Sequence, residues 1–188
     1  MATPSHSIPR YSELDEVDSA LLQQIVGEGQ LLADLAFADI VFWTKKQDGS
    51  FVAAAHLRPS SSATLFYRDV VGTTPRAEWQ RLIERAYGTK TIVDSSHPDW
   101  FEQTPARTRA VPVCRRGRAA VPNQDLGPLA VVTRHSNLSE SRMPSRLELT
   151  YNECANDLFQ MISEGTFPDP ETPTAPARGA PRASDGLI

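Results

Sequence analysis

The side chains with reactive chemistry are few in this sequence and lie far apart. Four histidines and two cysteines are separated by long intervals, without the short ligand spacing of a zinc site. The sequence contains neither a G-x-S-x-G nucleophile elbow nor a phosphate-binding P-loop. We therefore expect no catalytic residues and no metal ligands in this chain.

One cysteine lies in a positively charged neighbourhood. Cys114 precedes Arg115 and Arg116, and positive neighbours favour the thiolate form of a cysteine. A redox-sensing or metal-sensing thiol is one interpretation, and a small apolar strand residue is the one we prefer. Cys154 falls in a helical apolar pattern and is expected to pack against other side chains.

A second set of side chains could line a ligand pocket. His56 either lines such a pocket together with Arg58 or forms a hydrogen bond inside a covered sheet. Most aromatic side chains are expected in the core, but Trp100 and Phe101 lie in an irregular segment where a lid over a pocket would be expected. The ligand-pocket candidates are His56, Arg58, Tyr67, Trp100, Phe101, Arg109 and Cys114.

The elements that would position these residues follow from apolar periodicity. Helical spacing predicts a helix over 13–26, with Ser12 at its start, and a shorter one over 30–36. Strands are predicted over 38–46 and 51–58, joined by a turn at Asp48-Gly49.

The strand over 51–58 is apolar on both sides. Simple alternation places Phe51 and Ala55 on one face and Ala54 and His56 on the other. A strand of this kind is covered on both faces, which indicates the middle of a layered domain.

The rest of the domain alternates between short strands and helices. Thr74 is expected to cap a helix that begins at Pro75 and ends at Gly88. Further strands are predicted over 63–67, 89–94, 107–115 and 127–135, an irregular segment over 95–106, and a last helix over 144–163.

The last predicted helix carries a heptad-like apolar seam. Its members step by four and three residues, as in a coiled coil; they are Leu147, Tyr151, Cys154, Leu158 and Met161. This seam is either a dimer and signalling interface or the side of an amphipathic helix that packs on its own sheet.

Composition and length limit the possible partners. The net charge is −4, no apolar run approaches the roughly 20 residues of a membrane span, and the N-terminus lacks the pattern of a secretory signal. We expect a cytoplasmic protein with no membrane or nucleic-acid partner. The domain organisation is a flexible tail over 1–11, one domain over 12–164, and a proline-rich linker over 165–188.

Several segments resemble the N-terminal GAF domain of actinobacterial cytosolic sensor histidine kinases of the PdtaS type. The segments are VGEGQLLADLAFADIVFW (26–43), DVVGT (69–73), LAVVTRH (129–135), CANDLFQMISEGTFPD (154–169) and APRASDGLI (180–188). The resemblance implies a GAF-like α+β fold. Its central, mostly antiparallel sheet would have five to six strands, with the N- and C-terminal helices on one face and a helix and loops on the other.

The resemblance also implies partners. In that family the domain precedes PAS and kinase domains, and a response regulator of the antiterminator type lies downstream. We expect this chain to form a homodimer. A small molecule such as a cyclic dinucleotide is a possible ligand, and no cofactor is certain. We expect a non-catalytic sensory and dimerisation domain that signals through its last helix. The alternatives are a ligand-free structural dimerisation module and a stand-alone redox enzyme of GAF fold.

Overall fold

The computed structural model describes residues 14–115, 127–139 and 143–168. Within these ranges, four α-helices and six β-strands form one α+β unit, which confirms the predicted fold class. The elements are α2 (Glu16–Gly27), α3 (Gly29–Ala36), β1 (Ala38–Lys45), β2 (Phe51–Leu57), α4 (Ala77–Thr89), β3 (Val93–Asp94), β4 (Asp99–Phe101), β5 (Thr104–Val113), β6 (Ala130–Asn137) and α5 (Arg146–Glu164). The predicted tail, most of the predicted linker and the loop over 116–126 lie outside the described residues.

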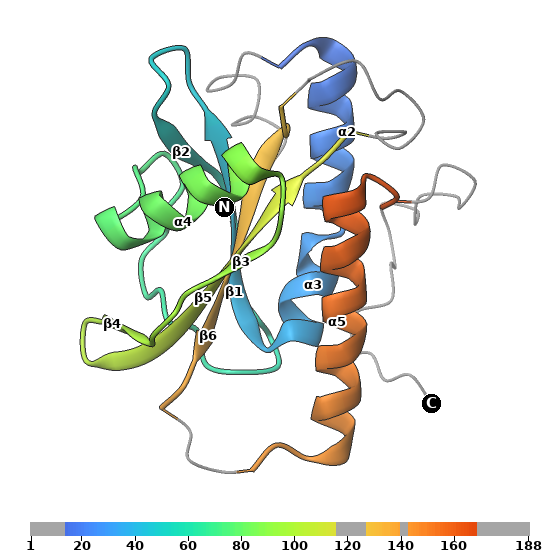
Figure 1. The fold of residues 1–188 in the computed structure, drawn as a ribbon. Helices are drawn as coiled ribbons and strands as arrows, with labels where there is room; N and C mark the ends of the chain where they lie inside the picture. Colours follow the sequence, from blue (N-terminus) through green and yellow to red (C-terminus); the bar gives the residue numbers. More distant parts are fainter. Residues whose placement is uncertain (1–13, 116–126, 140–142, 169–188) are drawn as a thin grey trace.

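The strands form one antiparallel sheet with the order β2-β1-β6-β5-β3, and β4 pairs with β5. Figure 1 shows α2, α3 and α5 along one face of this sheet and α4 across the other. None of the helices in the described ranges combines the length and the apolar composition needed to cross a membrane.

Both faces of the sheet are buried, as the apolar strand over 51–58 predicted. The α5 side of the sheet presents Ile40, Phe42 and Val132 to the helices, and the α4 side presents Val41, Trp43 and Val131 to α4 and its flanking loop. The strand β1 therefore lies in the middle of three layers, with helices or loops on either side.

A β-bulge changes which side chains of β2 share a face. The pairing of β1 with β2 shifts between Phe42 and Trp43, so that Ala54 is the extra residue. Ala54 and Ala55 both join the core on the α5 side, and His56 joins Phe51 on the α4 side. The simple alternation that placed His56 with Ala54 is therefore wrong.

Three further local predictions are also wrong. The strand predicted over 63–67 is a loop, because its backbone binds the carboxylate of Asp39 instead of a neighbouring strand. The segment over 95–106 contains β4 and the start of β5. The helix α4 has Arg76 rather than Thr74 as its N-cap, and it continues past Gly88.

The ends of the helices on the α5 side are well defined. Asp15 caps α2 by accepting a hydrogen bond from the backbone N–H of Asp18 at 2.7 Å, and Ser12, the predicted start, lies outside the described residues. Ser145 and Glu148 form a reciprocal capping box at the start of α5. Phe37 ends α3 in the left-handed region, with φ of 48°, and turns the chain directly into β1.

The two glycines between α2 and α3 should respond oppositely to substitution. A Cβ atom on Gly29 would lie 2.8 Å from Cδ1 of Leu57 and 3.3 Å from Cε2 of Phe42, whereas one on Gly27 would meet nothing within 4 Å. We expect Gly29→Val to lower the free energy of unfolding by about 1–3 kcal/mol through overpacking. Gly27→Ala should raise it by roughly 0.5 kcal/mol by removing backbone freedom. Urea unfolding measures both, and equal effects would contradict the close approach at Gly29.

Candidate functional site

A buried carboxylate organises the α4 side of the sheet. The side chain of Asp39, at the start of β1, accepts hydrogen bonds from the Thr64 hydroxyl at 2.6 Å and from the Leu65 backbone N–H at 2.7 Å. Its Oδ1 atom also lies 3.3 Å from Nε2 of His56, whose Nδ1 atom lies 3.8 Å from Asp69. These contacts fix the loop after β2 against the sheet.

A second buried histidine lies deeper in the same layer. His135 has one ring nitrogen 3.2 Å from the Thr108 hydroxyl and the other 2.8 Å from the Thr133 hydroxyl, which also accepts a hydrogen bond from the Trp43 indole at 2.7 Å. Complete burial lowers the pKa of His135 from 6.5 to about 3. The ring is therefore neutral at physiological pH.

Aromatic rings fill the space between these histidines and α4. Phe66 packs against Trp79 at 5.5 Å, against Phe101 at 4.8 Å and against His135 at 5.1 Å between ring centroids. The guanidinium of Arg76 lies over the rings of Trp79 and Phe101, at 5.2 and 5.6 Å. This side of the sheet is a packed core rather than an open cleft.

A partly buried arginine connects the sheet to α5. Arg134, on β6, donates hydrogen bonds to the Ala36 carbonyl at 2.9 Å, to Ser136 at 3.1 Å, and to the side-chain oxygens of Asn152 and Asn156. Each of these acceptors is neutral. The guanidinium thus joins the end of α3, the sheet and two turns of α5.

A second arginine lies directly across the strand pair. Arg109, on β5, is the register partner of Arg134 and donates to the same Asn156 oxygen at 2.9 Å. It also forms a bidentate pair with Asp94, at 2.7 and 3.1 Å. Burial, and then the charge of Arg109, lower the pKa of Arg134 to about 10, so Arg134 remains charged at neutral pH.

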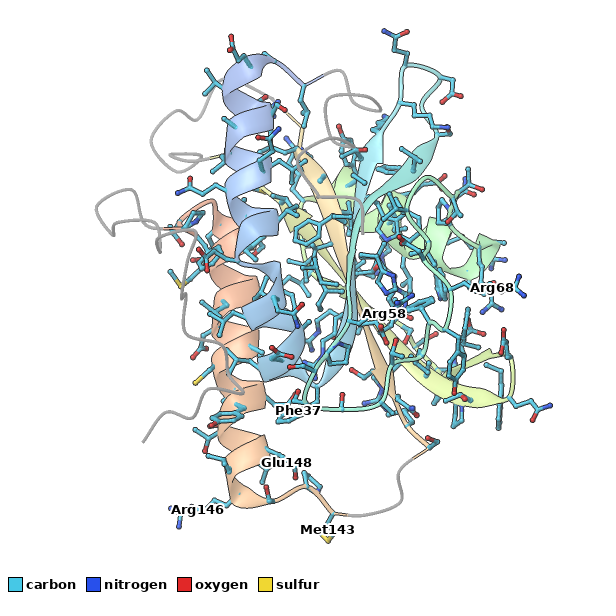
Figure 2. All side chains as sticks on the ribbon, turned by 180° about the vertical axis from the view of Figure 1, so that it is seen from behind. Phe37, Arg58, Arg68, Met143, Arg146 and Glu148 are labelled. Atoms are coloured by element: carbon cyan, nitrogen blue, oxygen red, sulfur yellow. The ribbon has the colours of Figure 1, made fainter. Side chains whose placement is uncertain are left out.

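A pocket of about 170 Å³ lies at the N-terminal end of α5. Figure 2 shows Phe37 and Glu148, two of its lining residues, close together at this end of the domain. The full lining is Phe37, Ser61, Ser62, Ala63, Asn137, Pro144, Glu148 and Asn152. The Ser62 hydroxyl oxygen is buried and has no hydrogen-bond partner among the residues that the structure describes. A larger and more open hollow, of about 600 Å³, lies between the α4–β3 connection and the C-terminal end of α5.

The predicted ligand-pocket residues on the α4 side of the sheet do not all line a cavity. The side chain of His56 is 2% exposed, and its Nε2 atom contacts the carboxylate of Asp39, as the hydrogen-bonded interpretation expected. Phe101 lies on β4 and packs into the aromatic core. Tyr67 and Trp100 point into solvent, at 81% and 61% exposure, and Arg58 is exposed as well.

The other two candidates lie elsewhere. Arg109 faces α5 on the opposite side of the sheet from His56. Cys114 is 3% exposed, and its backbone N–H donates to the Ile162 carbonyl at 3.2 Å. Its neighbour Arg115 pairs with Asp18 of α2. The seven predicted residues therefore do not form one site.

The predicted seam of α5 lies beside its buried face. The helix packs on its own sheet through Ala155, Phe159 and Ile162. Of the seam residues, Leu147 and Cys154 are exposed, and the other three, Tyr151, Leu158 and Met161, are half-buried. Cys154, which was expected to pack against other side chains of the seam, is exposed in the single chain.

Metal chemistry finds no support in the described part of the chain. No three His, Cys, Asp or Glu side chains there are placed to hold a metal ion. His97 is exposed and contacts Ser96, whereas His135 is buried. The two cysteines form no disulfide.

Sequence reasoning missed the polar residues that the structure places at interfaces: Asp39, Arg134, Asn152 and Asn156. One signal was available, because Asp39 precedes the apolar run of β1, and charged residues are rarely buried without partners. Arg134 gives no such signal, since polar residues surround it on β6. No comparable signal marks the two asparagines, which lie on a helix rich in polar residues.

Comparisons with known proteins agree with this architecture. A family model described as the GAF domain of histidine kinase PdtaS matches residues 5–155. Sensor histidine kinases PdtaS of Mycolicibacterium smegmatis and Mycobacterium tuberculosis are 36% identical to this chain over 173 residues, which is 89% of the chain and 32% of each relative. The chain thus spans about a third of the length of these relatives. A solved structure described as the sensor region of a sensor histidine kinase is 33% identical, with a TM-score of 0.73, over 99% of this chain and 60% of that chain.

Fold and relatives together define a sensory domain of GAF type. Within that class, the chain belongs to the GAF domain family of the histidine kinase PdtaS.

The buried His135 should make the protein less stable at mildly acidic pH. Below about pH 6.5 the unfolded chain binds a proton at this histidine, and the folded chain binds it only near pH 3. The free energy of unfolding should therefore fall with decreasing pH over this window, by roughly 1.4 kcal/mol per unit. His135→Gln should make the profile shallower by that slope, as measured by urea unfolding between pH 7 and about 5. The exposed His97→Gln is the control, and parallel profiles for wild type and His135→Gln would contradict the prediction.

Substitution of Asn156, which accepts hydrogen bonds from both arginines, tests the network between the sheet and α5. Asn156→Asp places a carboxylate within reach of both guanidiniums, and charge-assisted hydrogen bonds are roughly twice as strong as neutral ones. We expect this change to raise the free energy of unfolding by about 0.5–1 kcal/mol at low salt and by less at high salt. Gln160→Glu adds the same charge to an exposed position of the same helix, away from both arginines and beside Glu164, and should give no gain. An equal response of the two variants would show that Asn156 does not connect the arginines.

Proposed function

We propose that this chain is the signal-receiving and dimerisation domain of a cytosolic sensor histidine kinase. In this proposal the domain binds a small cytosolic molecule and transmits the bound state through α5 to the domains that follow. The observation that carries the proposal is the arrangement of α5, which is fixed to the sheet by one face and keeps the seam beside that face partly exposed.

The position of α5 supports a role in transmission. Its contacts with the sheet combine apolar packing at Phe159 with the network of Arg109 and Arg134. A change at the sheet or at the end of α3 would therefore alter the hydrogen bonds that hold α5. Signalling requires an element with two arrangements that a ligand biases, and a helix held largely by neutral hydrogen-bond acceptors suits that requirement.

The partly exposed seam supports self-association. Leu147 is 60% exposed and Cys154 lies on the surface, next to half-buried seam residues. Two copies with their α5 helices parallel would bury these groups and direct both C-terminal ends toward the next domain of each chain. The relatives are named sensor histidine kinases, so we propose PAS and kinase domains as the partners within the parent chain and an antiterminator-type response regulator as the target of the whole protein.

One observation favours a second candidate function, a structural dimerisation module without a ligand. The α4 side of the sheet is filled by Phe66, Trp79 and Phe101, so that no ligand space is needed there to complete the fold. Under this alternative the domain only pairs and spaces the kinase subunits. We do not propose the redox enzyme, because Cys114 is buried and Cys154 is an exposed helix residue.

Substitution at the seam tests self-association. We expect Leu147→Glu to weaken dimerisation by at least about tenfold, because a carboxylate would have to be buried in an apolar contact, while thermal stability stays unchanged at this exposed position. Tyr67→Glu, on an 81% exposed residue away from α5, is the matched control. Sedimentation analysis measures both. A wild-type chain that remains monomeric at high concentration, or a dimer that Leu147→Glu does not weaken, would overturn the dimer proposal.

A further inference from the structure

The hairpin of β4 and β5 leaves part of the α5 side of the sheet uncovered. Phe101 packs against Phe66 in the aromatic core beneath α4, so Trp100, the preceding residue of β4, points to the opposite face. Figure 1 shows β4 and the start of β5 projecting away from α5, which covers this face nearer the middle of the sheet. The indole of Trp100 therefore lies in solvent, with 61% of the residue exposed.

Three arginines lie on the same face of the sheet as Trp100. Val111 belongs to the core on the α5 side, and alternation along β5 places Arg107 and Arg109 on that side as well. Arg109 is directly opposite Arg134 in the pairing of β5 with β6. Arg107 is exposed and forms no hydrogen bond or ion pair with the residues that the structure describes.

The positive charge of this face is only partly balanced. Like charges directly opposite each other on neighbouring strands are destabilising. In the described part of the chain, Asp94 is the one carboxylate that forms an ion pair with any of the three arginines. The side chain of Arg109 is 31% exposed and that of Asp94 is 50% exposed, so solvent reaches this pair. A further carboxylate arriving from solvent would offset the repulsion between the guanidiniums.

The backbone of Trp100 at the free edge of β4 is already hydrogen-bonded. Its N–H donates to the side chain of Asp99 at 2.8 Å, and its carbonyl accepts from the Arg76 guanidinium at 3.3 and 3.4 Å. These two groups are therefore not available to an added strand, which is one common way of binding an extended peptide. A partner has to lie across the open face, against the indole and the guanidiniums.

The composition of this face favours a protein partner over a nucleic acid. Tryptophan and arginine are enriched among the residues that dominate binding at protein interfaces. Nucleic-acid binding is typical of basic domains, whereas this chain has a net charge of −4. The carboxylate of Asp94 would also repel a phosphate backbone, but it can accept a hydrogen bond from a peptide N–H.

We propose that Trp100, Arg107 and Arg109 form a docking surface for an acidic segment of a partner protein, whose carboxylates contact the guanidiniums and whose apolar side chains contact the indole. The inference goes beyond the proposed function, because it requires neither a ligand nor a dimer. The docking surface and the seam lie on different sides of α5. Asn156, which accepts from Arg109, is two residues from Cys154 of the seam, a rotation of about 200° around the helix.

Three probes of equal length and different charge test the chemistry on the 188-residue chain. They are a glutamate-rich peptide with a few leucines, the same peptide with lysine in place of each glutamate, and an oligothymidylate. In NMR titrations the glutamate peptide should give saturable shifts at the backbone amides of residues 99–109, and its affinity should fall as salt is added. The lysine peptide should not bind, and the oligothymidylate should bind at least about tenfold more weakly.

The contrary outcomes of the titrations are equally specific. No saturable shift with the glutamate peptide, shifts confined to another part of the chain, or binding of the lysine peptide would overturn the proposal. An oligothymidylate that binds as tightly as the glutamate peptide would overturn it in favour of a nucleic-acid surface.

Two variants locate the binding groups. Arg107→Glu reverses an exposed charge and should weaken binding of the glutamate peptide by at least about tenfold. Trp100→Ala should weaken it by roughly threefold or more, through loss of the contact with leucine. The matched controls are Arg81→Glu, at an exposed position of α4, and Tyr67→Ala, and neither should change the affinity. A reversal at Arg107 that weakens binding no more than the reversal at Arg81 would overturn the assignment.

Sedimentation separates this surface from the dimer of the proposed function. Arg107→Glu should leave self-association of the chain unchanged, because Arg107 is not on the seam. Loss of self-association in this variant would show that the surface joins two copies of the chain, and it would overturn the proposed acidic partner. A wild-type chain that stays monomeric would contradict the dimer and leave peptide binding intact.

Discussion

The partly buried charge of Arg134 constrains how the helices lie on the sheet. A guanidinium that loses part of its contact with water needs acceptors for its N–H groups, and here α3 supplies a carbonyl while α5 supplies two amide oxygens. Phe37 takes up a left-handed conformation, which ends α3 next to the arginine and starts β1 at once. One side chain thus joins α3, β6 and α5, in addition to the apolar packing between them.

The two faces of the sheet differ in how their polar and charged groups are held. On the α4 side, Asp39 and His135 are buried among packed aromatic rings and have hydrogen-bond partners. Close packing and complete hydrogen bonding favour a single arrangement of these side chains. On the α5 side, two like charges share one amide and have a single carboxylate between them, Asp94. The first face stabilises the fold. In the proposed function, the network on the second face would let a ligand or a partner helix adjust α5.

The sequence predicted the architecture better than the site. Apolar periodicity located the main helices and strands, because each element buries a long regular stripe. It failed at 63–67, where the backbone of the loop donates a hydrogen bond to the carboxylate of Asp39 on β1 instead of pairing with a strand. It also failed at His56, because a single bulged residue reverses the alternation of side chains along β2. The network of Arg134 and Asn156 joins residues far apart in the chain, and no local pattern encodes that contact.

We propose that α5 pairs with α5 of a second copy along its partly exposed seam. The native Cys154 gives a direct measurement, since it is exposed on that seam whereas Cys114 is buried. A spin label attached to Cys154 should report a single intersubunit distance within about two helix diameters, roughly 25 Å, in dipolar electron resonance. A distance far beyond that range, or no coupling between labels at a concentration where the protein is dimeric, would contradict the parallel arrangement of the two helices.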